Sequence, residues 1–332
     1  MGASQSLTKD GDTAAAMSQP FFTVIIPVYN RAGPLKEAIA SVLAQTCQDF
    51  EIVVVDDGSS DDPAASVAGF ADPRIRLFRQ ENAGGGAARN RAMAEARGRF
   101  IAPLDSDDIF LPHHLAALRA LLDGTTHTAA FARVRVDRGQ GRVFLKPPRA
   151  PRPDEDMAEY LLCERGFVPT ISLAVPAEMA RRIGYADLPP AEDTDFAIRL
   201  FNAGLRFVMA ERAGAVWRDT ADPGRSSASR DAESFRRWLE AMKPVMTPRA
   251  FHGGRGWAYA KLVRRQSRTK ALGLYLAALL RGCYAPRLAL VILLQILLSD
   301  AGYRRLADTA IGRLRVGLRE KTPAARNENV MA

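Results

Sequence analysis

The stretch FTVIIPVYN, residues 22–30, is an apolar, largely β-branched run that ends in a polar residue. A second run of this kind, FEIVVV, occupies residues 50–55. Between the two, residues 34–44 carry apolar side chains at a helical spacing. A strand, a helix and a strand, with both strands continuously apolar, are typical of a parallel sheet covered on both faces. We therefore predict an α/β fold whose mostly parallel central sheet is flanked by helices.

Polar residues follow each expected strand. The pair YN at 29–30 ends the first strand, and DD at 56–57 ends the second. A third apolar run, residues 100–104, leads directly into DSDD at 105–108. In open α/β sheets, ligands bind at the carboxyl ends of the strands. We therefore expect these side chains to converge on one crevice.

The acidic cluster at 105–108 indicates a metal. Three carboxylates after a buried strand are costly unless a positive charge lies among them. Mg²⁺ or Mn²⁺ takes oxygen ligands, commonly one or two carboxylates together with substrate phosphates. The alternative is an acidic turn that caps the next helix, a position that favours Asp.

Four motifs, in this order, resemble the family 2 glycosyltransferases: TVIIPVYN (23–30), VVVDDGSSDD (53–62), ENAGGGAARNRAM (81–93) and IAPLDSDD (101–108). The resemblance covers roughly residues 21–225. It implies a GT-A fold, a nucleotide-diphosphate-sugar donor, a divalent metal and inversion at the anomeric carbon.

The resemblance also implies which residues bind the donor. Pro27, Tyr29 and Asn30 would line the donor site, with the Tyr29 ring against the nucleobase. Asp57 would read the base, while Asp56 would be structural. The alternatives are that Tyr29 only borders the core and that residues 57–60 are only a turn and a helix cap.

The glycine-rich segment and the acidic motif receive roles in the same way. Gly84 and Arg89 would line or shape the donor pocket, although each glycine could equally belong to a plain loop that enters a helix. A dinucleotide-binding fold is excluded, because no GxGxxG follows the first strand. By resemblance Asp107 ligates the metal, and Asp105 contacts the ribose, the sugar or a metal-bound water. We expect Asp108 to support the metal site or to cap a helix.

The segment AEDTDF, residues 191–196, precedes a predicted helix. The family carries a Glu-Asp pair at this place, which implies that Asp193 is the catalytic base and that Glu192 orients the acceptor or tunes Asp193. Inverting transfer needs one carboxylate to take the proton of the acceptor hydroxyl. The alternative is that these acids only cap a helix.

Two further groups of residues receive weaker predictions. By resemblance, Arg218 and Arg225 with the following serines would close over the pyrophosphate. His113 and His114 are adjacent, which makes them a poor metal pair. We expect both histidines on a helix surface.

The composition is that of a globular protein. Of 332 residues, 47% are hydrophobic, enough for a sizeable core. Residues 1–20 lack the apolar segment of a signal peptide, so we expect a disordered leader. Three widely spaced cysteines form neither a metal spacing nor a disulfide framework, which fits a reducing cytoplasm.

Positive charge is concentrated near the C-terminus. Residues 251–332 hold 15 Lys and Arg against 4 Asp and Glu. The segment 288–298 is almost wholly apolar, but at 1.5 Å per residue it is far shorter than the ~30 Å hydrocarbon core. We predict that residues 226–325 form a basic, amphipathic helical region that contacts an anionic membrane surface. Packing of these helices on the preceding domain is the alternative, and no nucleic-acid motif is present.

Together these patterns predict an inverting, metal-dependent glycosyltransferase, a hexosyl- or related transferase. It would move a sugar from a nucleotide-diphosphate-sugar, with a UDP-sugar favoured, to a sugar or lipid-linked acceptor. The product would belong to a surface polysaccharide or glycolipid. We expect a cytoplasmic protein, peripheral on the inner face of the membrane. The alternatives are a nucleotidyltransferase of similar fold and a non-catalytic nucleotide-sugar-binding membrane scaffold.

Overall fold

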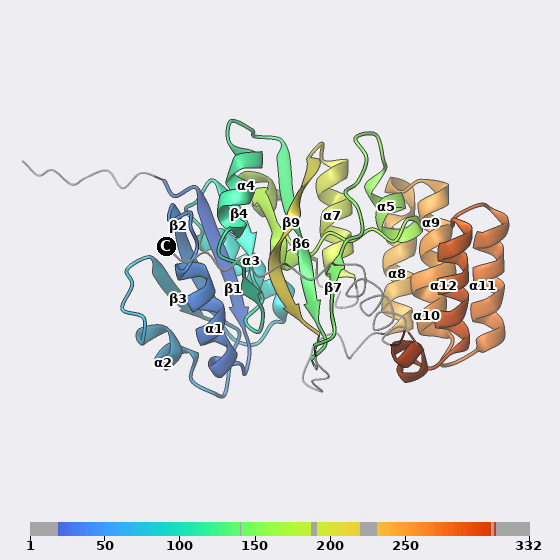
Figure 1. The fold of residues 1–332 in the computed structure, drawn as a ribbon, viewed down its shortest axis with the longest axis horizontal. Helices are drawn as coiled ribbons and strands as arrows, with labels where there is room; N and C mark the ends of the chain where they lie inside the picture. The colour runs from blue at the N-terminus through green and yellow to red at the C-terminus, as the bar shows by residue number, and fades with distance from the viewer. Residues whose placement is uncertain (1–18, 140, 187–190, 220–230, 307–308, 310–332) are drawn as a thin grey trace, which may run out of the picture.

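The computed structural model describes residues 19–139, 141–186, 191–219, 231–306 and 309. A single curved sheet with helices on both faces forms one end of the molecule, and a stack of helices forms the other end (Figure 1). The predicted leader and the last part of the predicted basic region therefore fall mostly outside the described residues.

The first half of the sheet is parallel, as predicted. Its strands, in spatial order, are β3 (Ile75–Arg79), β2 (Phe50–Asp56), β1 (Phe22–Val28) and β4 (Phe100–Pro103). The intervening helices are α1 (Ala32–Leu43), α2 (Pro63–Ala68) and α3 (Gly85–Glu95). Val28 pairs with Asp56, so β1 and β2 end together and their polar followers share one edge of the sheet.

The second half of the sheet is mixed. Strand β8 (Leu173–Pro176) pairs antiparallel with β4 and with β6 (Thr128–Asp137). Strand β9 (Arg206–Arg218) runs parallel to β6, while β5 (Ile109–Phe110) and β7 (Val143–Lys146) are antiparallel additions. Two reversals of direction leave β6 and β9 pointing the same way as β1. The carboxyl ends of β6 and β9 therefore lie at the same edge of the sheet as those of β1 and β2.

Both faces of the sheet are buried, as continuously apolar strands require. Alternate residues of β1 enter different core clusters: Ile25 joins one, and Val24 and Ile26 join the other. The first cluster is covered by α3, α5 (Met157–Cys163), α6 (Ala177–Ile183) and α7 (Glu192–Asn202), and the second by α1 and α4 (His114–Leu122).

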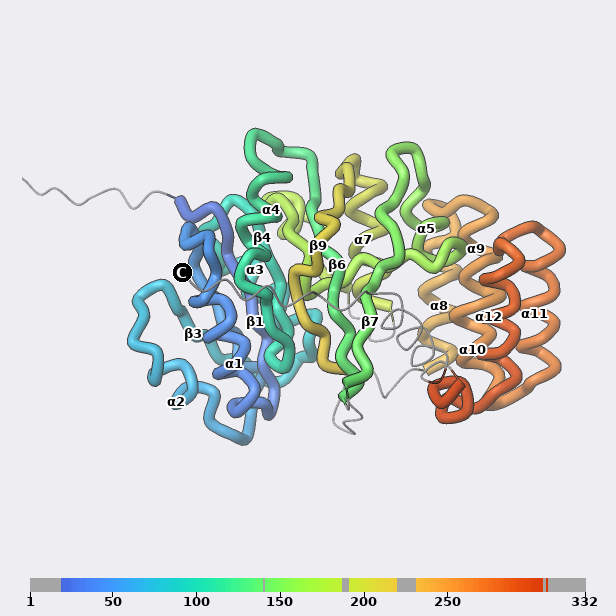
Figure 2. The backbone as a smooth tube through the Cα atoms, viewed as in Figure 1, coloured from blue at the N-terminus to red at the C-terminus, as the bar shows by residue number. Residues whose placement is uncertain are grey.

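The C-terminal helices extend this core. They are α8 (Ala232–Met242), α9 (Pro248–Gly254), α10 (Ala260–Val263), α11 (Arg268–Leu280) and α12 (Pro286–Leu297), with a π-helical turn at Arg255–Tyr259. Phe251 and Tyr259 belong to the same core cluster as Phe196 of α7. The chain path in Figure 2 shows the C-terminal helices stacked side by side. Within this stack, α9 packs against α5, which in turn contacts α7.

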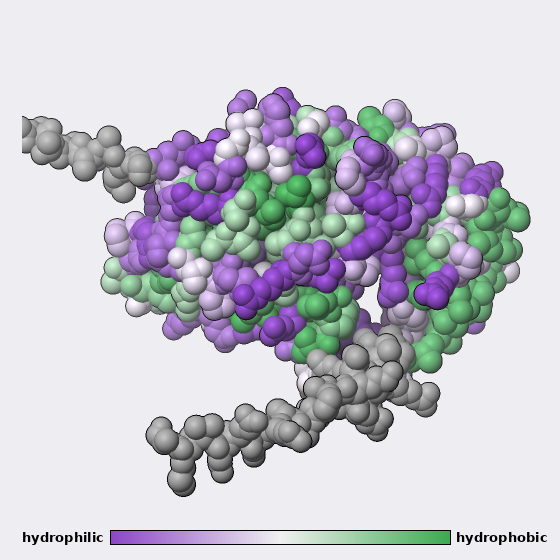
Figure 3. All heavy atoms as spheres, turned by 45° about the horizontal axis from the view of Figure 1, so that its top comes forward, coloured by the Kyte–Doolittle hydropathy of each residue, from purple (hydrophilic) through white to green (hydrophobic). Residues whose placement is uncertain are grey.

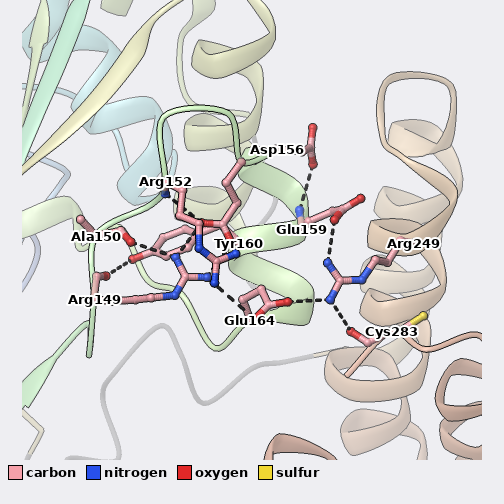
Figure 4. A network of polar contacts seen from close by, with 10 residues as sticks. Arg149, Ala150, Arg152, Asp156, Glu159, Tyr160, Glu164, Arg249 and Cys283 are labelled. Atoms are coloured by element: carbon pink, nitrogen blue, oxygen red, sulfur yellow. Dashed lines mark hydrogen bonds and ion pairs between the residues drawn. The ribbon is translucent and has the colours of Figure 1, made fainter. Parts of the chain in front are cut away.

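A polar network joins α9 to the end of α5. Arg249 donates to Glu159 Oε2 at 2.7 Å and to Glu164 Oε1 at 2.6 Å, and it also contacts the carbonyl of Cys283 (Figure 4). Arg149 pairs with Glu155 on the other side of the same network. The C-terminal helices are thus tied to the sheet domain by charge as well as by apolar packing.

The apolar segment noted at 288–298 lies almost wholly in the short helix α12. This helix has 12 residues and buries Leu288, Ile292 and Ile296. Across the described residues, none of the helices combines the length and the apolar character needed to cross a bilayer.

The prediction that both histidines lie on a helix surface is wrong for His114. Its side chain is fully buried, with its ring 4.4 Å from that of Phe110. Gly214 allows this packing, because a Cβ there would overlap the imidazole. Neither ring nitrogen has a hydrogen-bond partner among the described residues, and burial lowers the pKa of His114 to about 3.

Candidate active site

The loop after β1 carries one exposed aromatic residue and one structural amide. Tyr29 is 50% exposed, which leaves its ring free to meet a ligand. Asn30 adopts a φ of 50°, and its Oδ1 accepts from the backbone N–H of Ser60 at 2.7 Å. Its own N–H donates to Ser59 Oγ. The Asn30 side chain therefore ties together the loops that follow β1 and β2, while Pro27 lies in β1 opposite Val55.

The two aspartates that follow β2 differ in their partners. Asp56 pairs with Arg79 at 2.7 Å and accepts from the Ser59 N–H, which agrees with a structural role. Asp57 is buried, and its carboxylate accepts from Gln80 Nε2 and from the backbone N–H groups of Ala83 and Gly84. Asp57 thus fixes the loop that leads into α3. Among the described residues, Oδ2 accepts only from Gly84, and it retains acceptor capacity for a ligand.

Glycines allow α3 to lie close to α7. Gly84 has a φ of 90° and precedes the first residue of the helix. A Cβ at Gly86 would lie 3.3 Å from the Ala186 carbonyl and 3.5 Å from Glu192 Oε2. Asn90 reinforces the contact, since its amide both donates to the Tyr185 carbonyl and accepts from the Tyr185 N–H.

Arg89 is the central cation of the site. It is 93% buried, and it donates to Asp105 Oδ1 and to Glu192 Oε1, each at 2.6 Å. Its guanidinium carbon lies 5.3 Å from the centre of the Tyr185 ring. Despite burial, the two carboxylates hold the pKa of Arg89 well above its usual range. Part of the positive charge that the acidic cluster requires is therefore a protein side chain.

The other acids of the 105–108 cluster point to different partners. Asp107 lies 3.6 Å from Arg31 Nη1 and keeps 20% of its side chain exposed. Asp108 is buried and accepts from the backbone N–H of Arg218 at 2.8 Å, which attaches the motif to β9. The side chain of Arg218 pairs with Glu37. The predicted partners of Arg218, from Arg225 onward, lie outside the described residues.

Asp193 lies in the first turn of α7, next to Glu192. Thr170 Oγ1 donates to its Oδ1 at 2.5 Å. Burial raises the pKa of Asp193 to about 6, with Arg89 opposing the shift and Glu192 adding to it. A carboxylate with this pKa is a stronger base than an ordinary aspartate and is still ionised at neutral pH.

The third acid of this turn has a different task. Asp195 is buried, pairs with Arg199, and accepts from Trp238 Nε1 at 3.0 Å, which joins α7 to α8. Sequence reasoning missed Thr170 and Trp238, because neither lies near the acidic segment in the chain. The one local sign of a role for Thr170 is that it is a polar residue just before the apolar strand β8.

Comparison with known proteins shows which family the N-terminal half of the chain resembles. Residues 23–175 match the family model described as "Glycosyl transferase family 2". This segment is therefore similar to the family 2 glycosyltransferases, and we refer to it as the glycosyltransferase domain. Asp193 lies beyond the matched segment but is hydrogen-bonded to it by Thr170, and the charge of Arg89 acts on its carboxylate.

Curated relatives of this glycosyltransferase domain are known. An uncharacterized glycosyltransferase of Rickettsia felis is 33% identical over 188 residues, which is 54% of this chain and 31% of the relative. The chain thus spans about a third of that relative's length. The amylovoran biosynthesis glycosyltransferase AmsB of Erwinia amylovora is 26% identical over 239 residues, 69% of this chain and 79% of the relative.

Solved structures confirm the fold of the glycosyltransferase domain and its helical extension. TarS residues 1–349 of S. aureus, in complex with UDP-GlcNAc, superposes with a TM-score of 0.57 at 20% identity, covering 89% of this chain and 92% of that one. The mannosyltransferase PcManGT of Pyrobaculum calidifontis, in complex with GDP-Man and Mn²⁺, gives 0.54 at 22% identity, covering 92% and 89%. The predicted GT-A-type fold with C-terminal helices is therefore confirmed.

The glycosyltransferase domain offers two carboxylates to a metal rather than a complete cage. Within the described residues, no cluster of three or more His, Cys, Asp or Glu side chains is arranged to hold a metal ion. Asp105 and Asp107 lie in one turn and remain 35% and 20% exposed. Mg²⁺ commonly uses one or two carboxylates and takes its remaining ligands from water and substrate phosphates. The residues present fit such an ion.

Proposed function

We propose that the chain is an inverting, metal-dependent glycosyltransferase that takes a sugar from a nucleotide-diphosphate-sugar. The observation that carries this proposal is the position of Asp193, a carboxylate of raised pKa at the start of α7. Its neighbour Glu192 is joined through Arg89 to Asp105 of the acidic motif. A base and a donor-binding motif that meet in this way are what inverting transfer requires.

In the proposed reaction, the acceptor hydroxyl oxygen attacks the anomeric carbon on the face opposite the nucleotide. The bond from that carbon to the diphosphate oxygen breaks as the glycosidic bond forms, and the hydroxyl proton passes to Asp193 Oδ. Thr170 orients the carboxylate. Glu192 is paired with Arg89, and its negative charge makes Asp193 a stronger base.

Donor binding is assigned to the loops at the carboxyl edge. Tyr29 would stack on the base, Asp57 Oδ2 would accept from it, and Gly84 and Arg89 would shape the pocket. Asp105 and Asp107 would hold Mg²⁺ or Mn²⁺, which would neutralise the charge that develops on the leaving diphosphate. We favour a UDP-sugar; the UDP-GlcNAc complex of TarS supports this choice, and the Mn²⁺ complex of PcManGT supports the metal.

The acceptor is assigned to surface polysaccharide or glycolipid synthesis, as a sugar or a lipid-linked sugar. The relationship to AmsB, an amylovoran biosynthesis glycosyltransferase, supports this assignment. A nucleotidyltransferase would carry a glycine-rich basic loop directly after β1, where this chain has VYNR at 28–31. A non-catalytic scaffold would have no use for a base of raised pKa.

We also propose that the C-terminal helices place the enzyme on the inner face of the membrane. Leu276 and Leu280 of α11 and Leu290 of α12 are 51%, 86% and 57% exposed. Figure 3 shows an apolar surface at the helical end of the molecule, the end to which the helices of these leucines belong. Arg281 and Arg287 lie beside them in the chain. Exposed leucines beside basic residues are typical of peripheral contact with anionic lipid.

A screen of nucleotide-sugars tests the catalytic proposal. Each UDP- and GDP-sugar is added with Mn²⁺ or with EDTA, and the shift of the melting temperature is measured. We expect one donor to stabilise the protein only with the metal, and the anomeric configuration of the transferred sugar to be inverted in the product. Transfer with retention, or the release of diphosphate from a nucleoside triphosphate, would contradict the proposal.

A further inference from the structure

A basic hollow of about 310 Å³ lies among the C-terminal helices, away from the candidate active site. It is bounded on one side by α11 and on the other by the segment that runs from α9 into the π-helical turn. Among the described residues that line it, four are basic and none is acidic; the basic ones are His252, Arg255, Lys270 and Arg281.

Helical geometry brings these basic residues together. Lys270, Gly273, Ala277 and Arg281 are spaced three or four residues apart and so share one face of α11. A Cβ at Gly273 would meet no atom within 4 Å, so the space beside this residue is open. His252 and Arg255, three residues apart, present their side chains from the opposite wall.

In the part of the chain that the structure describes, none of the four basic residues forms an ion pair with an acid. Arg281 Nη1 donates to the Ala277 carbonyl at 2.7 Å, and the Arg255 guanidinium lies 5.6 Å from the Phe251 ring centre. Burial, together with the charges of Arg281, Arg255 and Lys243, lowers the pKa of His252. The positive charge of the hollow is therefore available to an anionic ligand.

The hollow adjoins the exposed leucines of α11. Leu280 directly precedes Arg281, and Leu276 lies one turn earlier on nearly the same face. These two side chains are 51% or more exposed. A cluster of cations next to a protruding apolar pair matches a lipid, in which a phosphate lies beside acyl chains.

We infer that this hollow binds the phosphate group of an anionic membrane lipid, while Leu276 and Leu280 enter the acyl region beside it. Guanidinium and ammonium groups supply the hydrogen-bond donors that phosphate oxygens accept. The inference rests on the proposed membrane association and specifies the site that binds the lipid phosphate. It is independent of donor binding at the carboxyl edge of the sheet.

The test compares two double variants of equal charge. Arg255→Gln with Arg281→Gln removes two cations from the hollow. Arg182→Gln with Arg268→Gln removes two exposed cations of α6 and α11 that do not line it. Sedimentation with vesicles of phosphatidylglycerol in phosphatidylcholine measures binding, and the melting temperature and UDP-sugar binding confirm that each variant is folded.

We expect the hollow variant to lose about tenfold or more in vesicle binding, and the control at most about threefold. We also expect NMR to show a rise in the pKa of His252 on addition of a soluble short-chain phosphatidylglycerol, but little change with inorganic phosphate alone. Equal losses in both variants, or equal binding to pure phosphatidylcholine, would overturn the inference. A His252 shift of the same size with inorganic phosphate would assign the hollow to a free anion instead.

Discussion

Arg89 and Glu192 are 103 residues apart in the chain, and their ion pair at 2.6 Å joins α3 to the first turn of α7. The same guanidinium holds Asp105 at 2.6 Å on its other nitrogen. One buried cation therefore sets the relative position of the acidic motif after β4 and of the proposed catalytic pair, Glu192 and Asp193. Loss of this residue should affect folding and catalysis together.

Arg89→Ala is expected to lower the free energy of unfolding by about 3–5 kcal/mol, because two carboxylates lose their buried partner. Urea unfolding measures the change. Arg91→Ala is the matched control, since Arg91 forms an exposed pair with Glu95 on the same helix and should cost no more than about 0.5 kcal/mol. Adding Glu192→Gln to Arg89→Ala should restore part of the stability. Equal effects of the two single variants would mean that Arg89 is not a central cation.

Asp193→Asn should reduce turnover by roughly 10²–10⁴-fold while donor affinity stays within about twofold. The wild-type rate should rise with pH through about 6, as Asp193 ionises, and level off above it. Steady-state kinetics and donor titration by calorimetry separate the two effects. A variant with near wild-type turnover would reduce Asp193 to a helix cap.

The same substitution should stabilise the fold. Because the pKa of Asp193 is raised in the folded state, the folded protein binds this proton more tightly than the unfolded chain does, and stability is lost as pH rises from 4 to 6. The neutral amide avoids this loss. We expect the melting temperature of Asp193→Asn to exceed that of the wild type at pH 7.5 and the difference to shrink near pH 4.

Asp107→Asn should abolish the Mn²⁺-dependent part of UDP-sugar binding, because the amide is a weaker metal ligand than the carboxylate. Calorimetric titrations with and without Mn²⁺ measure this. Asp123→Asn, at the exposed C-terminal end of α4, serves as the control and should bind as the wild type does. If the Asp107 variant kept its full metal dependence, the ion would be held elsewhere.

His114 should make the fold sensitive to acid. The pKa of His114 is about 3 in the folded protein and about 6.5 in an unfolded chain. As pH falls below 6.5, the unfolded chain therefore binds a proton at this residue while the folded protein does not, which favours unfolding. Between pH 7 and 5 this costs about 2 kcal/mol. The difference in unfolding free energy between the two pH values should be smaller by that amount in His114→Leu. It should be unchanged in His127→Gln, which alters an exposed histidine.

Exposed leucines test membrane contact better than deletion does. Removing residues 251–332 would strip Phe251 and Tyr259 from the core that they share with α7, so the remaining chain would not fold normally. Leu276→Gln with Leu280→Gln leaves the core intact and should weaken binding to anionic vesicles about tenfold. Leu145→Gln, 50% exposed on β7, is the control. Wild-type binding by the double variant would mean that α11 does not meet the membrane.

The amino-acid sequence by itself determined three parallel strands of the sheet and the place of the polar residues that follow them. Continuous apolar runs at 22–28 and 50–55 become adjacent parallel strands because such runs can be satisfied only where both faces are buried. The geometry of parallel strands then brings residues 29–30, 56–57 and 105–108 to one edge. Both features, the apolar runs and the polar residues after them, are patterns among neighbouring residues, so they can be recognised from the sequence alone.

Only the tertiary structure decided the partners of the charged and buried groups. Which cation neutralises Asp105, and which hydroxyl orients Asp193, depends on contacts between segments 16 to 103 residues apart. His114 lies on a helix that the sequence reads as surface, yet it is buried because Gly214 on β9 leaves room for its ring. Sequence spacing carries no information about such distant neighbours, since burial and ion pairing arise only when the helices and strands pack together.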